Sequence, residues 1–144
     1  FHAAELLNDE KITKIAIKSM DFLTKHTLSD NYLSIIGNEK WYKKGGDRSV
    51  FAQQPIDAMA MVLMYHQAFH VTKNKKYLSK LYTAFLWFLG ENDLRMSLYD
   101  FETKGCCDGF ESYGVNRNQG AESSLAYLIS YLTVLQAYEE FHET

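Results

Sequence analysis

Two acidic residues, Asp57 and Glu122, stand where a carboxyl group could do acid–base chemistry. Each follows a long polar loop and begins an apolar helical pattern. Hydrolysis of a glycosidic bond needs one carboxyl group that donates a proton and a second carboxylate that activates water or attacks the sugar. The ordinary explanation is the helix dipole, which favours an acid in a first turn by about 0.3 to 1 kcal/mol. We treat both residues as candidate catalytic groups, with Asp108 as their candidate partner.

Amide side chains gather at the same two loop–helix junctions. Amides donate and accept hydrogen bonds, and therefore match the hydroxyl groups of a sugar. Helix capping would explain Asn116 or Asn118 alone, and Asx turns would explain single loop acids, but six amides exceed what capping requires. We therefore expect a saccharide-binding surface that includes Gln53, Gln54, Asn92, Asp93, Asp100, Asn116, Asn118 and Gln119.

Loop aromatic residues could supply stacking contacts to a sugar ring. Trp41 lies among Lys40, Lys43 and Lys44 and is the best stacking candidate, with Tyr42 beside it. The apolar face of a pyranose gains from leaving water for such a surface. More often, aromatic residues of this kind close the end of a helical core. Within the predicted helices, Trp87 is assigned to the core.

Other site chemistries fit the sequence less well. His66 and His70 lie four residues apart, but the glutamate of the zinc-protease motif is missing and no third ligand is evident. The loop acids do not follow the calcium-loop pattern. Cys107 has no histidine near it in sequence to activate a thiol. The sequence therefore predicts neither a metal nor a cofactor.

Composition limits the class of protein. With 144 residues and 47% hydrophobic residues, the chain can bury the core of one helical domain, residues 1–144. A net charge of −3 argues against nucleic-acid binding. Adjacent cysteines without metal spacing favour a reducing, cytoplasmic setting, and no apolar run is long enough for a membrane span. Because the chain opens at Phe1 within a helical pattern, we expect the C-terminal part of a longer polypeptide.

The elements that must position these residues are four predicted helices. Apolar residues at helical spacing mark residues 9–26, 55–71, 77–89 and a segment after residue 118 that extends to about 135. Pro55 suits a first helical position, and the short link "TKNKK" predicts an antiparallel hairpin. If all sequential helices are antiparallel, the second and fourth begin at one end of the molecule. Both long loops, residues 29–53 and 91–118, would meet there.

A faint internal repeat agrees with this arrangement. The segments Gln54–Asp57 and Gln119–Glu122 share a glutamine and an acid three residues apart, and they lie 65 residues apart in the chain. Phe22-Leu23 and Phe88-Leu89 precede the long loops with a separation of 66 residues. A repeated helix–loop–helix unit predicts an all-α fold of antiparallel helical hairpins, either an α/α toroid or part of one.

Four segments together resemble a known family: "WYKKGG…FAQQPIDA", "WFLGENDL", "SLYDFETKGCCDGF" and "NRNQGAESSLAYL". They look like the helical region that accompanies bacterial glycosyltransferases of the GT-B type, which is similar to the six-hairpin glycosidase superfamily. The resemblance runs from about Lys40 to Leu132 and implies an α/α toroid and a glycan context. Because a glycine-rich phosphate-binding turn after a strand is missing, the transferase site is not expected in this chain. No catalytic residue is carried over.

Three functional hypotheses remain open. The first is a carbohydrate-active helical domain, associated with a glycosyltransferase domain, that binds an oligosaccharide and hydrolyses it. The second is a non-catalytic module that supports such a transferase domain. The third is a helical scaffold for protein partners, which would place exposed apolar surface on the helix flanks instead of at the loop end. Whether the chain is an enzyme is left open by the sequence.

Overall fold

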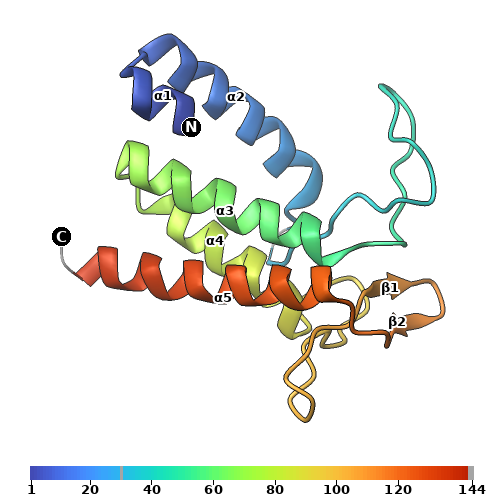
Figure 1. Ribbon diagram of the computed structural model, residues 1–144. Coiled ribbons are helices and arrows are strands. Elements are labelled where there is room, and N and C mark those ends of the chain that lie inside the picture. The colour runs from blue at the N-terminus through green and yellow to red at the C-terminus, as the bar shows by residue number, and fades with distance from the viewer. Residues whose placement is uncertain (30, 143–144) are drawn as a thin grey trace.

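The computed structural model describes residues 1–29 and 31–142 (Figure 1). Within these residues, helices alternate with two long connections, and one connection contains a short antiparallel sheet. In chain order the elements are α1 (His2–Leu7), α2 (Glu10–Thr27), α3 (Pro55–Thr72), α4 (Lys76–Leu86), the 3-10 helix η1 (Trp87–Leu89), β1 (Gly109–Glu111), β2 (Gly114–Asn116) and α5 (Ala121–His142).

The helix ends follow local chemistry. The Asp9 carboxylate caps α2 by accepting hydrogen bonds from the backbone N–H groups of Lys11 and Ile12, at 2.7 and 3.4 Å. Pro55 is the first residue of α3. At the other end of the hairpin, Gly90 stops η1 in a left-handed conformation with φ of 110°. All four predicted helices are therefore confirmed, and α5 continues beyond Leu135, the last residue of the predicted apolar pattern, to His142.

The helices α3 and α5 run side by side in the same direction, and α4 runs against both (Figure 1). The predicted α3–α4 hairpin is confirmed. At the start of α3 and α5, the first long connection meets the second. There the backbones of Gln53 and Phe110 exchange two hydrogen bonds, of 3.2 and 3.1 Å. The predicted gathering of both loops at one end of the molecule is confirmed as well.

The predicted fold class, an all-α toroid of hairpins or part of one, is wrong. The second long connection contains the β1–β2 sheet, in which Phe110 pairs with Val115 and Glu111 with Gly114. This hairpin forms because Phe110 is wholly buried on one side of β1 and Gly114, with φ of 133°, permits the tight return. In the described residues the architecture is mixed: α4 and α5 pack on α3, and the small sheet extends from their end.

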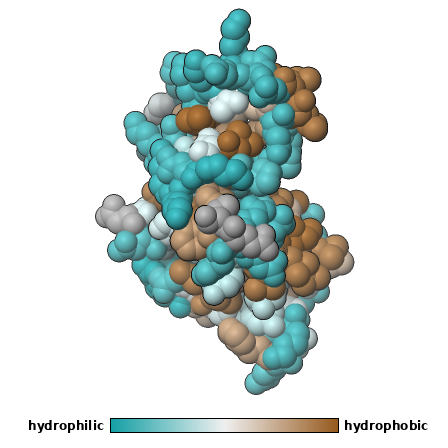
Figure 2. Space-filling model, turned by 90° about the vertical axis from the view of Figure 1, so that its left-hand side faces the viewer, coloured by the Kyte–Doolittle hydropathy of each residue, from teal (hydrophilic) through white to brown (hydrophobic). Residues whose placement is uncertain are grey.

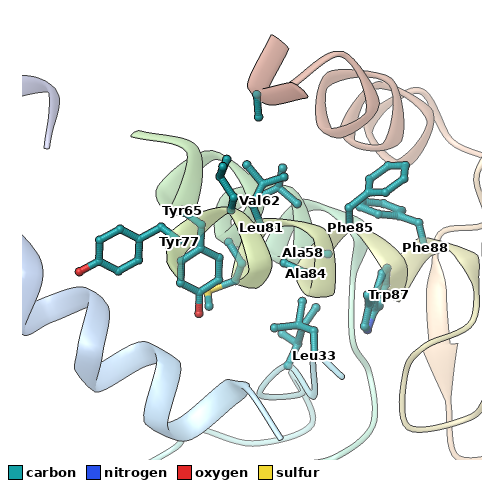
Figure 3. Close-up of a cluster of buried hydrophobic side chains, with 14 of the residues drawn as sticks. Leu33, Ala58, Val62, Tyr65, Tyr77, Leu81, Ala84, Phe85, Trp87 and Phe88 are labelled. Atoms are coloured by element: carbon teal, nitrogen blue, oxygen red, sulfur yellow. The ribbon is translucent and has the colours of Figure 1, made fainter. Parts of the chain in front are cut away.

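The core lies between α3, α4 and η1 (Figure 3). Figure 3 shows Val62 and Leu81 among the helices and Leu33 reaching them from the first long connection. The indole of Trp87 is fully buried, as predicted, and stacks on the ring of Phe110 with centroids 5.7 Å apart. The helical core is thus continuous with the sheet, so the loop end is held rigidly against the helices.

Candidate functional site

The starts of α3 and α5 place two predicted catalytic carboxylates at the same end of the molecule. Burial raises the pKa of Asp57 above its ordinary value, and the negative charge of Glu122 raises that pKa further. Two carboxylates influence one another in this way only at short range, because solvent and salt screen more distant pairs. The prediction that Asp57 and Glu122 share one end of the molecule is therefore confirmed (Figure 1).

A polar cleft of about 430 Å³ lies at this end. Its walls come from the first long connection, the residues just before α3, the β1–β2 hairpin and the first turn of α5. The volume falls within the range of small-ligand sites. The polar side chains that line the cleft are Asn38, Gln53, Gln54, Asp108, Glu111, Asn116, Glu122 and Ser123.

Asp108 caps the start of α5 from outside the helix. Its Oδ1 accepts hydrogen bonds from the Gly120 N–H at 2.7 Å and the Ser123 hydroxyl at 2.8 Å, and its Oδ2 accepts one from the Asn118 amide. These hydrogen bonds, that of Asn118 foremost, lower the pKa of Asp108. A Cβ on Gly120 would meet Oδ1 at 2.9 Å, so the close approach needs glycine. Asp108 is therefore a fixed anion that holds the cleft wall, which makes it a poor proton donor.

The side chain of Gln53 is buried and forms four hydrogen bonds inside the protein. Its Oε1 accepts hydrogen bonds from Trp87 Nε1 at 2.9 Å and the Ile35 N–H at 3.3 Å. Its Nε2 donates to Asp93 Oδ2 at 2.6 Å and to the Val50 carbonyl at 2.7 Å. With 1% of the residue exposed and all of its hydrogen-bonding capacity in use, Gln53 joins the two long connections. It supports the cleft and has no group left for a ligand.

Two further predicted residues also serve the second connection. Asp93 accepts a hydrogen bond from the Ser34 hydroxyl at 2.8 Å in addition to that from Gln53. Asn92 is fully buried, and its Nδ2 donates to the carbonyls of Trp87 and Met96, both at 2.8 Å. The Asn92 contacts fold the turn after η1, and the Asp93 contacts join that turn to the first long connection. The geometry favours a structural role for both side chains over contact with a saccharide.

Asp100 and Gln119 form a second pair of turn-stabilising residues. The Asp100 carboxylate accepts hydrogen bonds from the backbone N–H groups of Glu102 and Thr103, at 2.8 and 3.2 Å, and these lower its pKa. Gln119 Nε2 donates to Asp100 Oδ2 at 3.1 Å, and Gln119 Oε1 accepts from the Thr103 hydroxyl at 2.8 Å. Neither residue lines the cleft, and Asp100 lines a separate hollow of about 350 Å³.

The side chains left for a ligand in the cleft form a smaller set than predicted. Gln54 and Asn116 are exposed; Gln54 accepts one hydrogen bond from Asn38 Nδ2 at 3.0 Å, and Asn116 accepts one from the Asn118 N–H at 3.2 Å. Glu122 is exposed in the first turn of α5. These residues keep most of their donors and acceptors directed to solvent, as a sugar-binding surface requires.

Glu111 and Asn38 line the cleft but were not predicted as site residues. Glu111 falls in a segment interpreted as loop, because β1 is only three residues long and shows no clear alternation in the sequence. Asn38 follows Gly37, a position at which a Cβ would meet the Phe51 carbonyl oxygen at 1.6 Å. That glycine permits the close approach of the two arms of the first connection, and nothing local in the sequence marks it.

The predicted stacking residue Trp41 lies next to the cleft. It is 89% exposed and lines a neighbouring hollow of about 540 Å³ that shares Asn38 with the cleft. Tyr42 is half-buried, and its hydroxyl contacts His26 Nδ1 at 3.2 Å, which ties the first connection to the end of α2. Trp41 is therefore placed to extend a ligand-binding surface, whereas Tyr42 holds the connection in position.

His66 and His70 lie in α3, and their neighbours come from other helices. His66 Nε2 is 3.4 Å from Glu140 Oε1 in α5, and His70 Nε2 is 3.1 Å from Glu5 Oε1 in α1. Burial lowers the pKa of His66. The contacts link three helices, and the described residues contain no cluster of three or more histidine, cysteine, aspartate or glutamate side chains suited to a metal ion.

The adjacent thiols are poorly suited to nucleophilic chemistry. Both are free and buried. Burial raises the pKa of Cys106 to about 12 and also raises the pKa of Cys107. Since the thiolate is the reactive form, neither cysteine is a candidate nucleophile near neutral pH.

Comparisons with known proteins add no assignment. No model of a known protein family matches the chain, and a search of curated proteins gives no significant match. Among residues 1–29 and 31–142, no helix combines the length and apolar character that crossing a membrane demands. The cleft is therefore interpreted from its own chemistry.

Proposed function

We propose that the cleft between the starts of α3 and α5 binds an oligosaccharide, and that the chain is a carbohydrate-active module associated with a bacterial glycosyltransferase domain. The observation that supports the proposal is that some polar side chains at the loop end are structural while others remain accessible to a ligand. Gln53 and Asp108 are used up in structural hydrogen bonds, whereas Gln54, Asn116 and Glu122 remain open to the cleft. Exposed amides and carboxylates around one hollow complement hydroxyl groups that both donate and accept.

Hydrolysis is the activity that the carboxylates support best. Burial and the charge of Glu122 raise the pKa of Asp57, which favours its protonated form. A carboxyl group with a raised pKa is suited to donate a proton in glycoside hydrolysis. In the proposed reaction Glu122, which lines the cleft, activates the attacking water. Asp57, which lies in the first turn of α3 and is not among the lining residues, donates a proton to the leaving oxygen. Glu111, which also lines the cleft, is the second candidate base.

A glycan array followed by a product assay on the hits tests this function. We expect saturable binding and cleavage by the wild type, and loss of cleavage in Glu122→Gln without a change in the thermal melt. Glu10→Gln is the matched control, because Glu10 is also an exposed acid in the first turn of a helix. Unchanged cleavage in Glu122→Gln would remove Glu122 from the mechanism. Binding without turnover would support the non-catalytic module instead, and no binding would reject both.

We also propose a reducing, cytoplasmic setting. Cys106 and Cys107 both remain free thiols. Disulfides persist mainly in oxidising compartments, and two buried, adjacent thiols that form no bridge suit a reducing one. Fractionation of the cells that express the protein tests this placement.

A separate observation supports the hypothesis of a scaffold for protein partners. It requires exposed apolar surface on a helix flank, and α5 exposes Leu125, Leu128 and Leu132 on the flank away from α3. That flank is separate from the cleft lining, apart from the shared first turn of α5. The two functions are compatible.

A further inference from the structure

The helix α5 turns its small residues inward and its large apolar residues outward. Free energy gained on burial grows with apolar area, so a leucine gains more than an alanine or a serine. In α5 the order is reversed. The buried residues are Ser123, Ala126, Ser130, Thr133 and Ala137. The exposed leucines are Leu125, Leu128, Leu132 and Leu135, at 55%, 47%, 54% and 42% exposure.

These leucines belong to a continuous surface. Ile129 and Tyr138 are 40% and 56% exposed on the same helix. We call the surface of Leu125, Leu128, Ile129, Leu132, Leu135 and Tyr138 the α5 face. An apolar groove of about 750 Å³ runs along its N-terminal half, with Tyr99, Lys104 and Tyr131 among its walls. Figure 2 shows hydrophobic atoms gathered at the right-hand edge of the molecule. Exposed apolar side chains that gather on one face mark a site of interaction.

The spacing of the leucines indicates a helix as the occupant. Leu125, Leu128, Leu132 and Leu135 follow one another at intervals of three, four and three residues, which is the a/d spacing of a helix–helix seam. This pattern reads the same from either end. A two-fold axis between Leu128 and Leu132 therefore places each of these leucines against a leucine of an antiparallel second copy. A surface that complements itself in this way is what a two-fold dimer requires.

The charges of α5 also suit a second copy. Residues 123–138 include no charged side chain, so nothing in the middle of the seam repels a like surface. Continuing the antiparallel register outward places Glu139 of one copy opposite Ala121 of the other. The exposed Lys104 lines the groove beside Ala121. Opposite charges, Lys104 and Glu139, would thus meet at both ends of the interface.

We propose that the α5 face is a homodimer interface, in which two copies of α5 pack antiparallel about a two-fold axis. Tyr138 of each copy enters the apolar groove of the other, and Lys104 pairs with Glu139 at the rim. The dimer buries the large side chains that the single chain leaves exposed. It does not depend on the function proposed for the cleft.

Sedimentation equilibrium of the whole chain over a concentration series tests the proposal. We expect a monomer–dimer equilibrium, and an increase of about 100-fold in the dissociation constant for Leu132→Glu, which places a charge at the centre of the seam on both copies. Ile15→Glu is the matched control, because Ile15 is 64% exposed on α2, away from the face. Thermal melts verify that both variants fold. A wild type that stays monomeric at its highest soluble concentration, or equal effects of the two variants, would overturn the proposal.

A charge exchange tests the antiparallel register. Lys104→Glu should raise the dissociation constant of the dimer about tenfold, since it sets like charges together at both ends. Adding Glu139→Lys should restore the wild-type value within about threefold. If Leu132→Glu disrupts the dimer but the charge exchange leaves its dissociation constant unchanged, the two-fold antiparallel arrangement is wrong.

Discussion

Trp87 Nε1 donates a hydrogen bond of 2.9 Å to Gln53 Oε1, and both residues are at most 1% exposed. The bond links η1 to the residue that precedes the cap of α3, 34 positions earlier in the chain. The same Gln53 amide donates to Asp93. A buried polar group is stable only when its partners are present. The three side chains therefore fix the two long connections against each other and set the cleft end of α3.

Removal of the Gln53 amide should destabilise the fold. Gln53→Leu leaves the buried Trp87 Nε1 and the Ile35 N–H without their acceptor, and each buried unsatisfied group costs about 1 to 3 kcal/mol. We expect a loss of about 3 kcal/mol in the free energy of unfolding, measured by urea denaturation. Gln54→Leu is the control, because Gln54 is exposed; it should change stability by less than about 0.5 kcal/mol and lower glycan affinity. Equal losses in the two variants would contradict this division of roles.

Asp108 should contribute to stability as the cap of α5. Asp108→Ala removes the acceptors for Gly120, Ser123 and Asn118, and loss of a cap costs about 1 kcal/mol. Because the folded-state pKa of Asp108 is lowered, its contribution is present above the ordinary value of 3.8 and is lost as the pH falls through the lowered pKa. Urea denaturation at pH 7 and at progressively lower pH measures both effects. A difference between variant and wild type that is constant with pH would count against the capping role.

Asp57 should show the opposite pH dependence. Its folded-state pKa is raised, so its ionisation favours the unfolded chain, and stability falls as the pH rises from 3.8 through the raised pKa. Asp57→Asn removes this effect. The variant should be more stable than the wild type at pH 7, by less than about 1 kcal/mol once solvent screening is allowed for. The gain should vanish near pH 3.

Asp47→Asn provides the comparison for Asp57→Asn in the same denaturation series. Asp47 lies exposed in the first long connection, so its replacement should leave the pH profile of stability unchanged. A gain for Asp57→Asn that persists at pH 3 would show that relief of ionisation is not its cause. The electrostatic pairing with Glu122 would then lose its support in solution.

The periodicity of the apolar residues predicted more of this fold than of its site. Helical spacing identified α2 to α5, and Pro55 marked the start of α3, because these are local properties of the chain. The β1–β2 hairpin was missed since each strand is three residues long, too short for alternation to stand out. Side-chain burial depends on contacts between distant segments. Gln53 and Gln54 are chemically identical neighbours, and only the packing of Trp87 makes one structural and leaves the other exposed.

The side of α5 that faces α3 could not be predicted from the sequence either. Apolar residues surround the helix, so its pattern does not specify which side meets α3. The small residues Ser130 and Ala137 allow a close approach of the two helices, and this contact is formed. The leucine seam is consequently left outside. The placement of the two carboxylates, in contrast, could be predicted. The short α3–α4 link sets α4 against α3, and the added assumption that α5 runs against α4 gives α3 and α5 the same direction.

The two cysteines should resist alkylation in the native protein. With the pKa of Cys106 raised to about 12, only about one thiol in ten thousand is ionised at pH 8, and burial blocks access besides. We expect mass spectrometry to detect almost no iodoacetamide labelling of Cys106 or Cys107 in buffer, and complete labelling of both in urea. Rapid labelling of native protein would contradict their burial.

Trp41 should report on ligand binding at the edge of the cleft. Of the two tryptophans, Trp41 is 89% exposed and Trp87 is fully buried, so iodide should quench the fluorescence of Trp41 alone. A saccharide that stacks on Trp41 should protect it from iodide. Trp41→Ala should lower glycan affinity about tenfold, which corresponds to a loss of roughly 1.4 kcal/mol of binding free energy. It should leave the thermal melt unchanged. Phe101→Ala, at another exposed loop aromatic, should leave affinity intact. Full affinity in Trp41→Ala would restrict the binding surface to the cleft lined by Gln54, Asn116 and Glu122.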